Sequence, residues 1–571
     1  MKKFVNMTNN YSNMKFISTL AVLLALGTML TGQVAPDKYY IQFTDKNNSP
    51  YSINQPEEFL SQRAIDRREK YGIVITEEDL PVNPAYLQGV SAAGAQLLNP
   101  TKWMNGVTVF TEDTTVIELI GALPYVQNVV KLPQPIPTGI DKAYFANETI
   151  ALAEKLEYNN LKNTGTYNYG GAGPQINQIN GTVLHDMGYQ GQGVVIAVLD
   201  GGFSGTEQHP FFDSLWMNNR VLGTKDFVHP GGNVFTESGH GNSVLSTMAA
   251  YSPGQMIGTA PQAGYWLLRP EDVQSENVIE EYNWVSAAEF ADSVGADIIN
   301  SSLGYIDFDN PQFNHTYQDM NGATNVSTRG ADRAAEKGIV VVNSAGNSGN
   351  DPDFPYIGAP ADGFNVLSIG AVDPDGVRAS FSSIGPTYDG RHKPTIAATG
   401  QNTFVAYGMS DAGFGNGTSF SSPVIAGMTA CLVQAYPEMP VIEVHNALKQ
   451  SGSQALNPDD ILGWGIPDYG VAYGLLLEIA GNQANGKTLV EAFPNPFRYE
   501  LDLKLNLDSI ELVVVELIST SGKLVYSGKY TRSRADRIIN LDRVVNLLNS
   551  GVFYVRVVIP EKTEVIKIIK Q

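Results

Sequence analysis

The chain has 571 residues, 43% of them hydrophobic, which is too long for one core, so two to four globular domains are expected. The formal net charge of −21 argues against a nucleic-acid-binding protein, because no excess of cations is available to neutralise phosphates. Cys431 is the one cysteine, which excludes an intrachain disulfide and any metal site that needs two cysteines.

Residues 1–32 have the pattern of a secretory signal peptide. Three lysines precede an apolar run over residues 16–30, and the small residues Thr31 and Gly32 follow it. The apolar run is short for a membrane span, and no later stretch is long and apolar enough to provide one. We therefore expect an exported protein, secreted or held at the cell surface, without a transmembrane anchor.

Residues 33–160 are expected to form a separate α+β unit. The pattern predicts three strands and one charged helix, at Tyr39–Phe43, Val107–Phe110, Val126–Leu132 and Glu57–Tyr71 respectively. No Ser, His or Asp in this unit stands in a catalytic pattern, which leaves an adhesion module or a propeptide. The polar stretch over residues 159–171 is rich in glycine and asparagine and is interpreted as a linker and a processing site.

Residues 175–480 alternate strands with helices, a pattern typical of an α/β domain with a parallel sheet flanked by helices. Val194–Leu199 is a continuous aliphatic run, as expected of a buried parallel strand. The helices Trp284–Val294 and Arg329–Lys337 lead into the strands Asp297–Asn300 and Ile339–Asn343. In such sheets, functional residues gather where loops leave the carboxyl ends of the strands.

The last eighty residues differ in composition from the rest. A linker is expected at residues 481–488, and the domain from residue 490 to 571 opens with Phe493-Pro494-Asn495-Pro496-Phe497. Short strands are predicted at Leu501–Leu507, Leu512–Ile518, Leu524–Tyr526, Phe553–Ile559 and Val565–Ile569. Their spacing predicts a small β-sandwich.

Three residues in the α/β domain are candidates for nucleophilic catalysis. Asp200 follows the strand Val194–Leu199, and His240, one of seven histidines, opens a helix of small residues. Ser419 lies in Asn-Gly-Thr-Ser-Phe-Ser-Ser-Pro, at the start of an apolar helix. Each residue alone is more often a turn former, a helix cap or a surface side chain. The order Asp, His, Ser along the chain is the one that subtilisin uses, and other hydrolase classes use other orders.

These motifs together resemble the subtilisin-like serine proteases, over roughly residues 175–480. The resemblance implies that Ser419 is the nucleophile, His240 the general base and Asp200 the residue that orients it. Asn347 stands just beyond a buried strand, where the family places its oxyanion-hole asparagine. A peptide or protein substrate is implied, and no cofactor and no catalytic metal.

The resemblance also implies a substrate-binding surface. Ser302-Leu303-Gly304 corresponds to the segment that pairs with the substrate backbone, and Gly358 to the floor of the primary specificity pocket. None of these residues carries a carboxylate that could bind a basic side chain. We therefore expect a preference for large apolar residues on the acyl side of the cleaved bond. Two residues depart from the family pattern: Gly201 and Asn242 stand where Ser or Thr is usual. Both positions are expected to affect the orientation of Asp200 and His240 more than the chemistry of the site.

The regions on either side of residues 175–480 agree with this resemblance. Enzymes of this family usually carry an N-terminal α+β propeptide, which favours that interpretation of residues 33–160. The opening Pro494-Asn495-Pro496-Phe497, the strand Gly-Val-Phe-Tyr-Val-Arg-Val from Gly551 and the terminal residues 567–571 resemble the sorting domain of the type IX secretion system. The secretion machinery is therefore an expected partner.

Alternatives remain open at this point. A protein that keeps the fold without activity, or an acyl hydrolase that is not a peptidase, has a similar sequence pattern. The Asp-rich loops at residues 351–353 and 373–376 have the composition of structural calcium sites, although such loops are more often plain turns.

Overall fold

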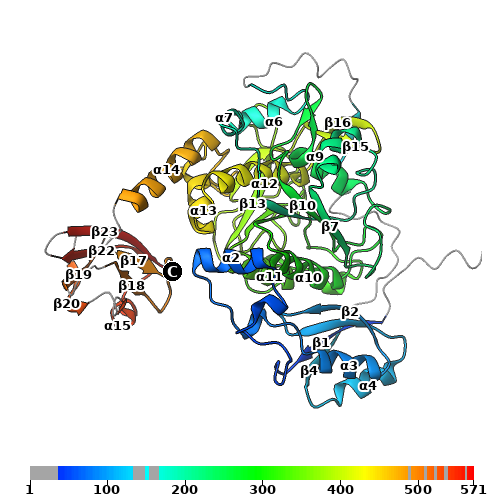
Figure 1. The fold of residues 1–571 in the computed structure, drawn as a ribbon, viewed down its shortest axis with the longest axis horizontal. Coiled ribbons are helices and arrows are strands. Elements are labelled where there is room, and N and C mark those ends of the chain that lie inside the picture. The colour runs from blue at the N-terminus through cyan, green and yellow to red at the C-terminus, as the bar shows by residue number, and fades with distance from the viewer. Residues whose placement is uncertain are drawn as a thin grey trace, which may run out of the picture. The chain divides into compact units, whose positions relative to one another are not determined.

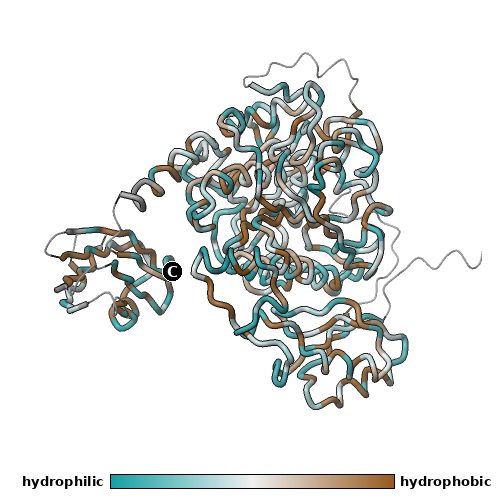
Figure 2. The backbone as a smooth tube through the Cα atoms, in the orientation of Figure 1, coloured by the Kyte–Doolittle hydropathy of each residue, from teal (hydrophilic) through white to brown (hydrophobic). Residues whose placement is uncertain are grey.

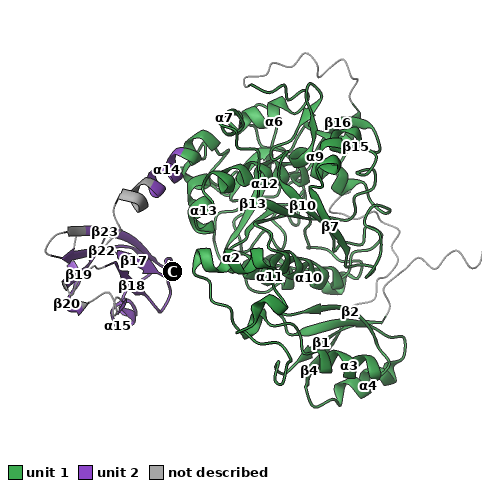
Figure 3. Cartoon of the chain, in the orientation of Figure 1, with its two compact units in different colours: residues 1–473 green, residues 474–571 purple. Residues whose placement is uncertain are grey.

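The computed structural model describes residues 37–132, 148–152, 166–485, 490–506, 511–519, 524–532, 538–559 and 562–571. The predicted signal peptide and most of the predicted processing linker lie outside these residues. The chain divides into two compact units, residues 1–473 and 474–571 (Figure 3). Below, the N-terminal domain means described residues 37–132, the central domain residues 166–473, and the C-terminal unit residues 474–571.

The central domain is built on a seven-stranded sheet whose neighbouring strands are all parallel, as the sequence predicted. The order is β14-β13-β12-β11-β6-β10-β7. The bounds are β6 Val195–Leu199, β7 Val221–Asp226, β10 Gly264–Arg269, β11 Ile298–Ser301, β12 Val340–Ser344, β13 Val366–Val372 and β14 Ile396–Thr399. Hydrophobic segments run through these strands (Figure 2), because a sheet covered on both faces must be apolar on both.

Helices cover both faces of this sheet (Figure 1). α9 (His240–Ala249) packs against α12 (Thr418–Ala435), and α12 also contacts β11 to β14. On the other face, α10 (Ile279–Val294) packs against α11 (Val326–Glu336). The carboxyl end of β6 therefore meets the N-terminal ends of α9 and α12 at one edge of the sheet.

A small antiparallel sheet packs against α9 through β15 (Thr403–Tyr407). β15 pairs with β16 (Asp411–Gly415), and β16 pairs with β5 (Ile150–Leu152) on its other side. β5 comes from the chain between the N-terminal and central domains. β16 runs directly into the loop that precedes α12, so β5 is brought close to the start of that helix.

The N-terminal domain has the α+β fold predicted for it. Its antiparallel sheet has the order β2-β3-β1-β4, with strands Gln96–Thr101, Gly106–Phe110, Lys38–Phe43 and Val126–Lys131. Helices α3 (Pro84–Ala92) and α4 (Thr114–Gly121) belong to the same domain. The charged helix is shorter than predicted: α2 spans Gln62–Tyr71, and only a 3₁₀ turn covers Pro56–Glu58. α2 begins there because the Ser61 hydroxyl caps it, accepting the Ala64 N–H.

Buried ion pairs hold the N-terminal domain on α10. The Asp292 carboxylate on α10 binds Arg67 at 2.6 Å and Arg68 and Lys102 at 2.9 Å, and all four residues are at most 9% exposed. Burial raises the pKa of Asp292, but the three cations outweigh it and hold the pKa well below its usual range. Asp292 is thus the shared partner of three buried cations, of which Arg68 also pairs with Asp79 at 2.9 Å, and such pairing offsets the cost of burying charge.

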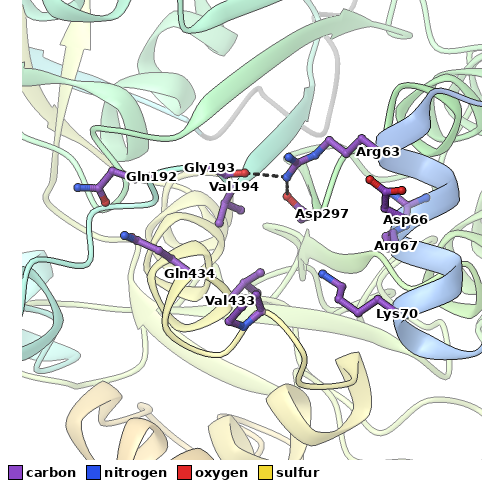
Figure 4. Close-up of a pocket in the computed structure, with 11 residues that line it drawn as sticks. Arg63, Asp66, Arg67, Lys70, Gln192, Gly193, Val194, Asp297, Val433 and Gln434 are labelled. Atoms are coloured by element: carbon purple, nitrogen blue, oxygen red, sulfur yellow. Dashed lines mark hydrogen bonds and ion pairs between the residues drawn. The ribbon is translucent and has the colours of Figure 1, made fainter.

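A pocket of about 400 Å³ lies where α2 meets the central domain (Figure 4). The Arg63 guanidinium donates to the carbonyl of Gly193 at 2.8 Å and pairs with Asp297. Gly193 precedes β6 and Asp297 precedes β11, so the pocket is at the end of the sheet where these strands begin. The candidate catalytic residues lie beyond the opposite ends of the strands.

The C-terminal unit contains two antiparallel sheets, with the orders β17-β18-β21 and β20-β19-β22-β23, and this confirms the predicted β-sandwich. The strands are Val490–Phe493, Asp502–Leu505 and Ile538–Asn540 in the first sheet, and Leu524–Arg532, Glu511–Ser519, Gly551–Ile559 and Lys562–Lys570 in the second. α14 (Tyr469–Asn485) extends into the stretch predicted as a linker. No helix within the described residues is both long and apolar enough to cross a membrane.

Candidate active site

Asp200 and His240 form an ion pair at the carboxyl edge of the central sheet. Asp200 follows the last residue of β6 and is fully buried, and His240 is the first residue of α9. The Nδ1 atom of His240 lies 2.8 Å from Oδ1 of Asp200, which also accepts the N–H of Gly201 at 2.8 Å. The ring is therefore held by a carboxylate that is itself fixed at a strand end.

The imidazole of His240 is surrounded by negative charge. Burial lowers its pKa, but the carboxylates of Asp200 and Glu148 outweigh burial and raise the pKa of His240 to about 10. In this arrangement His240 is a cation at neutral pH.

Ser419 is the second residue of α12 and is buried. Its hydroxyl lies 3.5 Å from the carbonyl oxygen of Ser302, and its own carbonyl accepts the Ser302 hydroxyl at 2.9 Å. The ring of the next residue, Phe420, has its centroid 6.0 Å from that of His240. The start of α12 is thus adjacent to the Asp200–His240 pair, and the helix N-terminus directs a positive field at Ser419.

Asn347 joins the same group from a third element. It follows β12, and its Oδ1 atom accepts the N–H of Thr418 at 2.9 Å and the Thr418 hydroxyl at 3.0 Å. These bonds orient the amide so that Nδ2 points to the other side, where it donates to Glu148 at 2.9 Å. The amide nitrogen therefore points toward Glu148, whose other oxygen contacts His240.

Glu148 is the residue that sequence reasoning missed. Its Oε2 atom lies 2.8 Å from Nε2 of His240, and its Oε1 atom accepts from Nδ2 of Asn347. Glu148 belongs to no motif and stands 92 positions before His240 in the chain. Its contacts depend on the pairing of β5 with β16, which no local pattern indicates.

The two departures from the family pattern have structural explanations. A Cβ atom on Gly201 would lie 2.5 Å from Cγ1 of Val273, so a larger side chain needs Val273 to move. The Oδ2 atom of Asp200 is buried, and within the described residues it has no hydrogen-bond partner. Asn242 is buried, accepts from Thr206 at 3.3 Å and donates to the carbonyl of Gly408 at 3.0 Å, so it supports α9 from below His240.

The predicted substrate-binding residues lie on the neighbouring strand ends. Ser302 contacts Ser419 as described, whereas Leu303 is 1% exposed and belongs to the hydrophobic core. After Gly304 the chain turns back, and the Tyr305 N–H donates to the carbonyl of Ala359 at 2.8 Å. A Cβ atom on Gly358 would lie 2.8 Å from Cγ1 of Ile306, so the space above Gly358 is bounded by an apolar side chain.

The two Asp-rich loops close as local turns. Asp351 accepts the N–H of Asp353 at 2.8 Å, and Asp373 accepts the N–H groups of Asp375 and Val377 at 3.0 and 2.9 Å. Elsewhere in the described part of the chain, oxygens of the buried Glu271, Glu276 and Glu280 lie within 4.8 Å of one another. A calcium requirement stays a prediction.

Comparison with known families divides the chain into three parts. Residues 191–465 match the subtilase family of S8 peptidases, and residues 38–144 match the peptidase S8 propeptide domain of Bacteroidota. Residues 491–571 match a secretion system C-terminal sorting domain, which marks the protein as secreted or displayed at the cell surface. The propeptide interpretation of the N-terminal domain is therefore confirmed over that of an adhesion module.

Several characterised subtilisins are similar to the central domain. Subtilisin NAT of Bacillus subtilis subsp. natto is 30% identical over 281 residues, which span 49% of this chain and 65% of that protein. Subtilisin DY of Bacillus licheniformis is 30% identical over 268 residues, or 47% of this chain and 86% of that protein. The subtilisin of Bacillus pumilus is 30% identical over 281 residues, 49% of this chain and 90% of that protein. With this coverage and this parallel α/β fold, the chain belongs to the subtilase family.

Proposed function

We propose that the protein is a secreted serine endopeptidase that cleaves peptide bonds through an acyl-enzyme intermediate on Ser419. The observation that carries this proposal is the ion pair between the buried Asp200 and the partly exposed His240, beside the N-terminus of the helix that bears Ser419. The three relatives described above are subtilisins, and the matched family is a peptidase family.

The proposed mechanism assigns one role to each group. Ser419 Oγ attacks the scissile carbonyl while Nε2 of His240 takes its proton. Asp200 fixes the tautomer through Nδ1 and stabilises the cation that forms. His240 then returns the proton to the leaving amine, and a water molecule releases the acyl group by the same route. The Asn347 amide and the backbone N–H of Ser419 donate to the oxyanion.

Substrate recognition follows from the neighbouring strands. We propose that Ser302-Leu303-Gly304 pairs with the substrate backbone as an added strand, and that Gly358 forms the floor of the primary pocket. The side chain of Ile306 against Gly358 supports an apolar pocket. Each apolar methylene that fills it contributes about 0.8 kcal/mol, which favours large apolar or aromatic residues before the cleaved bond.

We further propose that the C-terminal unit is recognised by the type IX secretion machinery. The support is the match of residues 491–571 to a sorting domain, together with the β-sandwich fold of that unit.

The test of the proposed activity is a purified, folded Ser419→Ala protein, freed of its N-terminal domain by an added protease that is then removed, and assayed on a fluorogenic peptide. Loss of the nucleophile should lower kcat by a factor on the order of 10⁶, leaving only what binding and the oxyanion donors supply. Ser421→Ala is the matched control, since the Ser421 hydroxyl donates to the carbonyl of Thr418 within the same helix turn. A folded Ser419→Ala enzyme with normal turnover would end the proposal.

A further inference from the structure

Residues 148–152, here called the plug segment, lie along the strand that leads into α12. β5 pairs antiparallel with β16, and the N–H of Asn416 donates to the carbonyl of Thr149 at 3.2 Å. The register is Ile150 opposite Gly415, Ala151 opposite Phe414 and Leu152 opposite Gly413. A Cβ atom on Gly413 would lie 2.4 Å from the carbonyl oxygen of Ala151, so glycine permits this approach. The plug segment thus binds as an added strand, as peptide ligands do at a sheet edge.

The first residue of the plug segment places a carboxylate among the proposed catalytic groups. The Glu148 side chain is 4% exposed, with one oxygen on His240 and the other on Asn347. A Cβ atom on Gly417 would lie 2.5 Å from Oε1 of Glu148, so the carboxylate also lies against the loop before Ser419. Both oxygens are engaged, which fixes the side chain in one position.

We propose that Glu148 is a tethered inhibitor of the precursor, whose carboxylate occupies the position where the reacting carbonyl of a substrate binds. The inference rests on the proposed function, because it assigns a role to contacts with His240 and Asn347. The Nε2 atom of His240 must accept the proton of Ser419, and Nδ2 of Asn347 must donate to the oxyanion. A carboxylate bound to both takes both groups out of use, as a negatively charged analogue of the oxyanion would.

The connection to the chain strengthens this inhibitor. Glu148 is joined to the N-terminal domain on one side and to the central domain on the other, so its binding is intramolecular. Tethering of this kind raises the effective concentration of a ligand at its site, so a contact that is weak on its own can still occupy the site. The N-terminal domain, anchored through Asp292, holds one end of this link in place.

The first experiment measures how fast a fluorophosphonate probe labels Ser419 in the intact precursor. Glu148→Gln, which keeps the shape but removes the charge, should label faster than wild type by a factor on the order of 10–100. Glu148→Asp, which is one methylene shorter and cannot reach both partners, should also label faster. Glu118→Gln is the matched control, because Glu118 is exposed on α4, and it should label as wild type does.

The outcomes separate this inference from the proposed function. If the processed wild-type enzyme labels but the Glu148 variant precursors label no faster than the wild-type precursor, the tethered-inhibitor inference is wrong and the peptidase proposal stands. If neither precursor nor processed enzyme labels, the proposed function fails and the inference falls with it.

A second experiment needs no activity. The imidazole of His240 can be titrated by NMR in a Ser419→Ala precursor, where the charged groups that face it are Asp200 and Glu148. The pKa should lie near 10 and should fall by more than one unit in Glu148→Gln, because one of the two carboxylates is lost. An unchanged His240 pKa would show that Glu148 does not bind the imidazole in solution and would overturn the inference.

Discussion

At the scale of single residues, Asn347 uses the two ends of one amide for different purposes. Its oxygen accepts from the N–H and the hydroxyl of Thr418, and its nitrogen donates to Glu148 beside His240. In the proposed mechanism the nitrogen stabilises charge that exists only in the transition state. The oxygen, in contrast, stabilises the loop that positions Ser419.

Two substitutions separate these roles in the processed enzyme. Asn347→Ala should lower kcat by a factor on the order of 10²–10³ with little change in KM. It should also lower the free energy of unfolding by about 1–3 kcal/mol, because the buried N–H of Thr418 loses its acceptor. Asn347→Asp keeps the acceptor, so it should lose kcat with a smaller loss of stability. Steady-state kinetics and urea unfolding measure both effects, and a change confined to KM would remove Asn347 from the oxyanion role.

Candidate site residues could be predicted where they stand in a short local motif, as Asp200, His240, Ser419 and Asn347 do. The fold places Asp200 against His240 and Asn347 against the start of the helix that bears Ser419, and their catalytic roles stay predictions. Glu148 could not be predicted, since its position depends on strand pairing between residues more than 250 positions apart. The reason for a glycine at position 201 could not be predicted either. A larger residue there would contact the side chain of Val273, and no sequence pattern indicates that Val273 lies nearby.

At the scale of elements, α10 is the surface on which the N-terminal domain docks. The Glu289 carboxylate on α10 accepts the backbone N–H groups of Lys102 and Trp103 at 2.7 and 2.9 Å. Burial raises the pKa of Glu289 to about 7, although Lys102 and these N–H groups oppose the shift. Asp292, one turn further along α10, pairs with three cations, so much of the docking energy depends on two carboxylates of one helix.

Asp292→Asn tests this docking surface in a Ser419→Ala precursor that cannot cleave itself. Removing the charge leaves buried cations without their shared partner, which should lower the free energy of unfolding by about 3–5 kcal/mol. Because the pKa of Asp292 is lowered in the folded state, this stabilisation is present at neutral pH and is lost as the pH falls through that lowered pKa.

The matched control for Asp292→Asn is Glu336→Gln. Glu336 pairs with Arg333 on the exposed side of α11, where both side chains are about half exposed, so its loss should cost about 0–1 kcal/mol. Chemical denaturation followed by circular dichroism measures both variants. Equal shifts for the two would mean that the buried pairs do not hold the N-terminal domain in place.

Elements were predicted well where burial dictates the pattern and less well at helix ends. The fully buried strand β6 begins at Val195, one residue after the predicted start. The start of α2 was predicted at Glu57, which is too early. The Ser61 hydroxyl caps the helix, so α2 begins at Gln62 although the residues before Ser61 also fit a helical pattern. α14 continues past Gly481 because an existing helix gains a hydrogen bond with each added residue, and one glycine costs only about 1 kcal/mol.

At the scale of the whole molecule, the C-terminal unit has a core of its own. Leu503, Val515 and Val555 are fully buried in it, and among the described residues that cluster draws only on residues 490–568. The core around the seven-stranded sheet lies within residues 1–473 and includes Trp103 of the N-terminal domain. Neither core, as far as the described residues show, needs side chains of the other unit.

This separation predicts that export and catalysis can be uncoupled. Deleting residues 490–571 should leave peptidase activity in cell extracts unchanged while the enzyme no longer reaches the exterior of its native host. Val515→Asp should block export in the same way without removing any chain, because a charge in the sandwich core unfolds the sorting domain. Leu547→Asp, the same kind of change at a side chain that is 87% exposed, should be exported normally. Immunodetection of the enzyme in medium and extract, together with peptide hydrolysis in both fractions, measures all three. If the truncated enzyme is found in the medium at the wild-type level, export does not depend on the C-terminal unit, and the sorting proposal is wrong even though the family match stands.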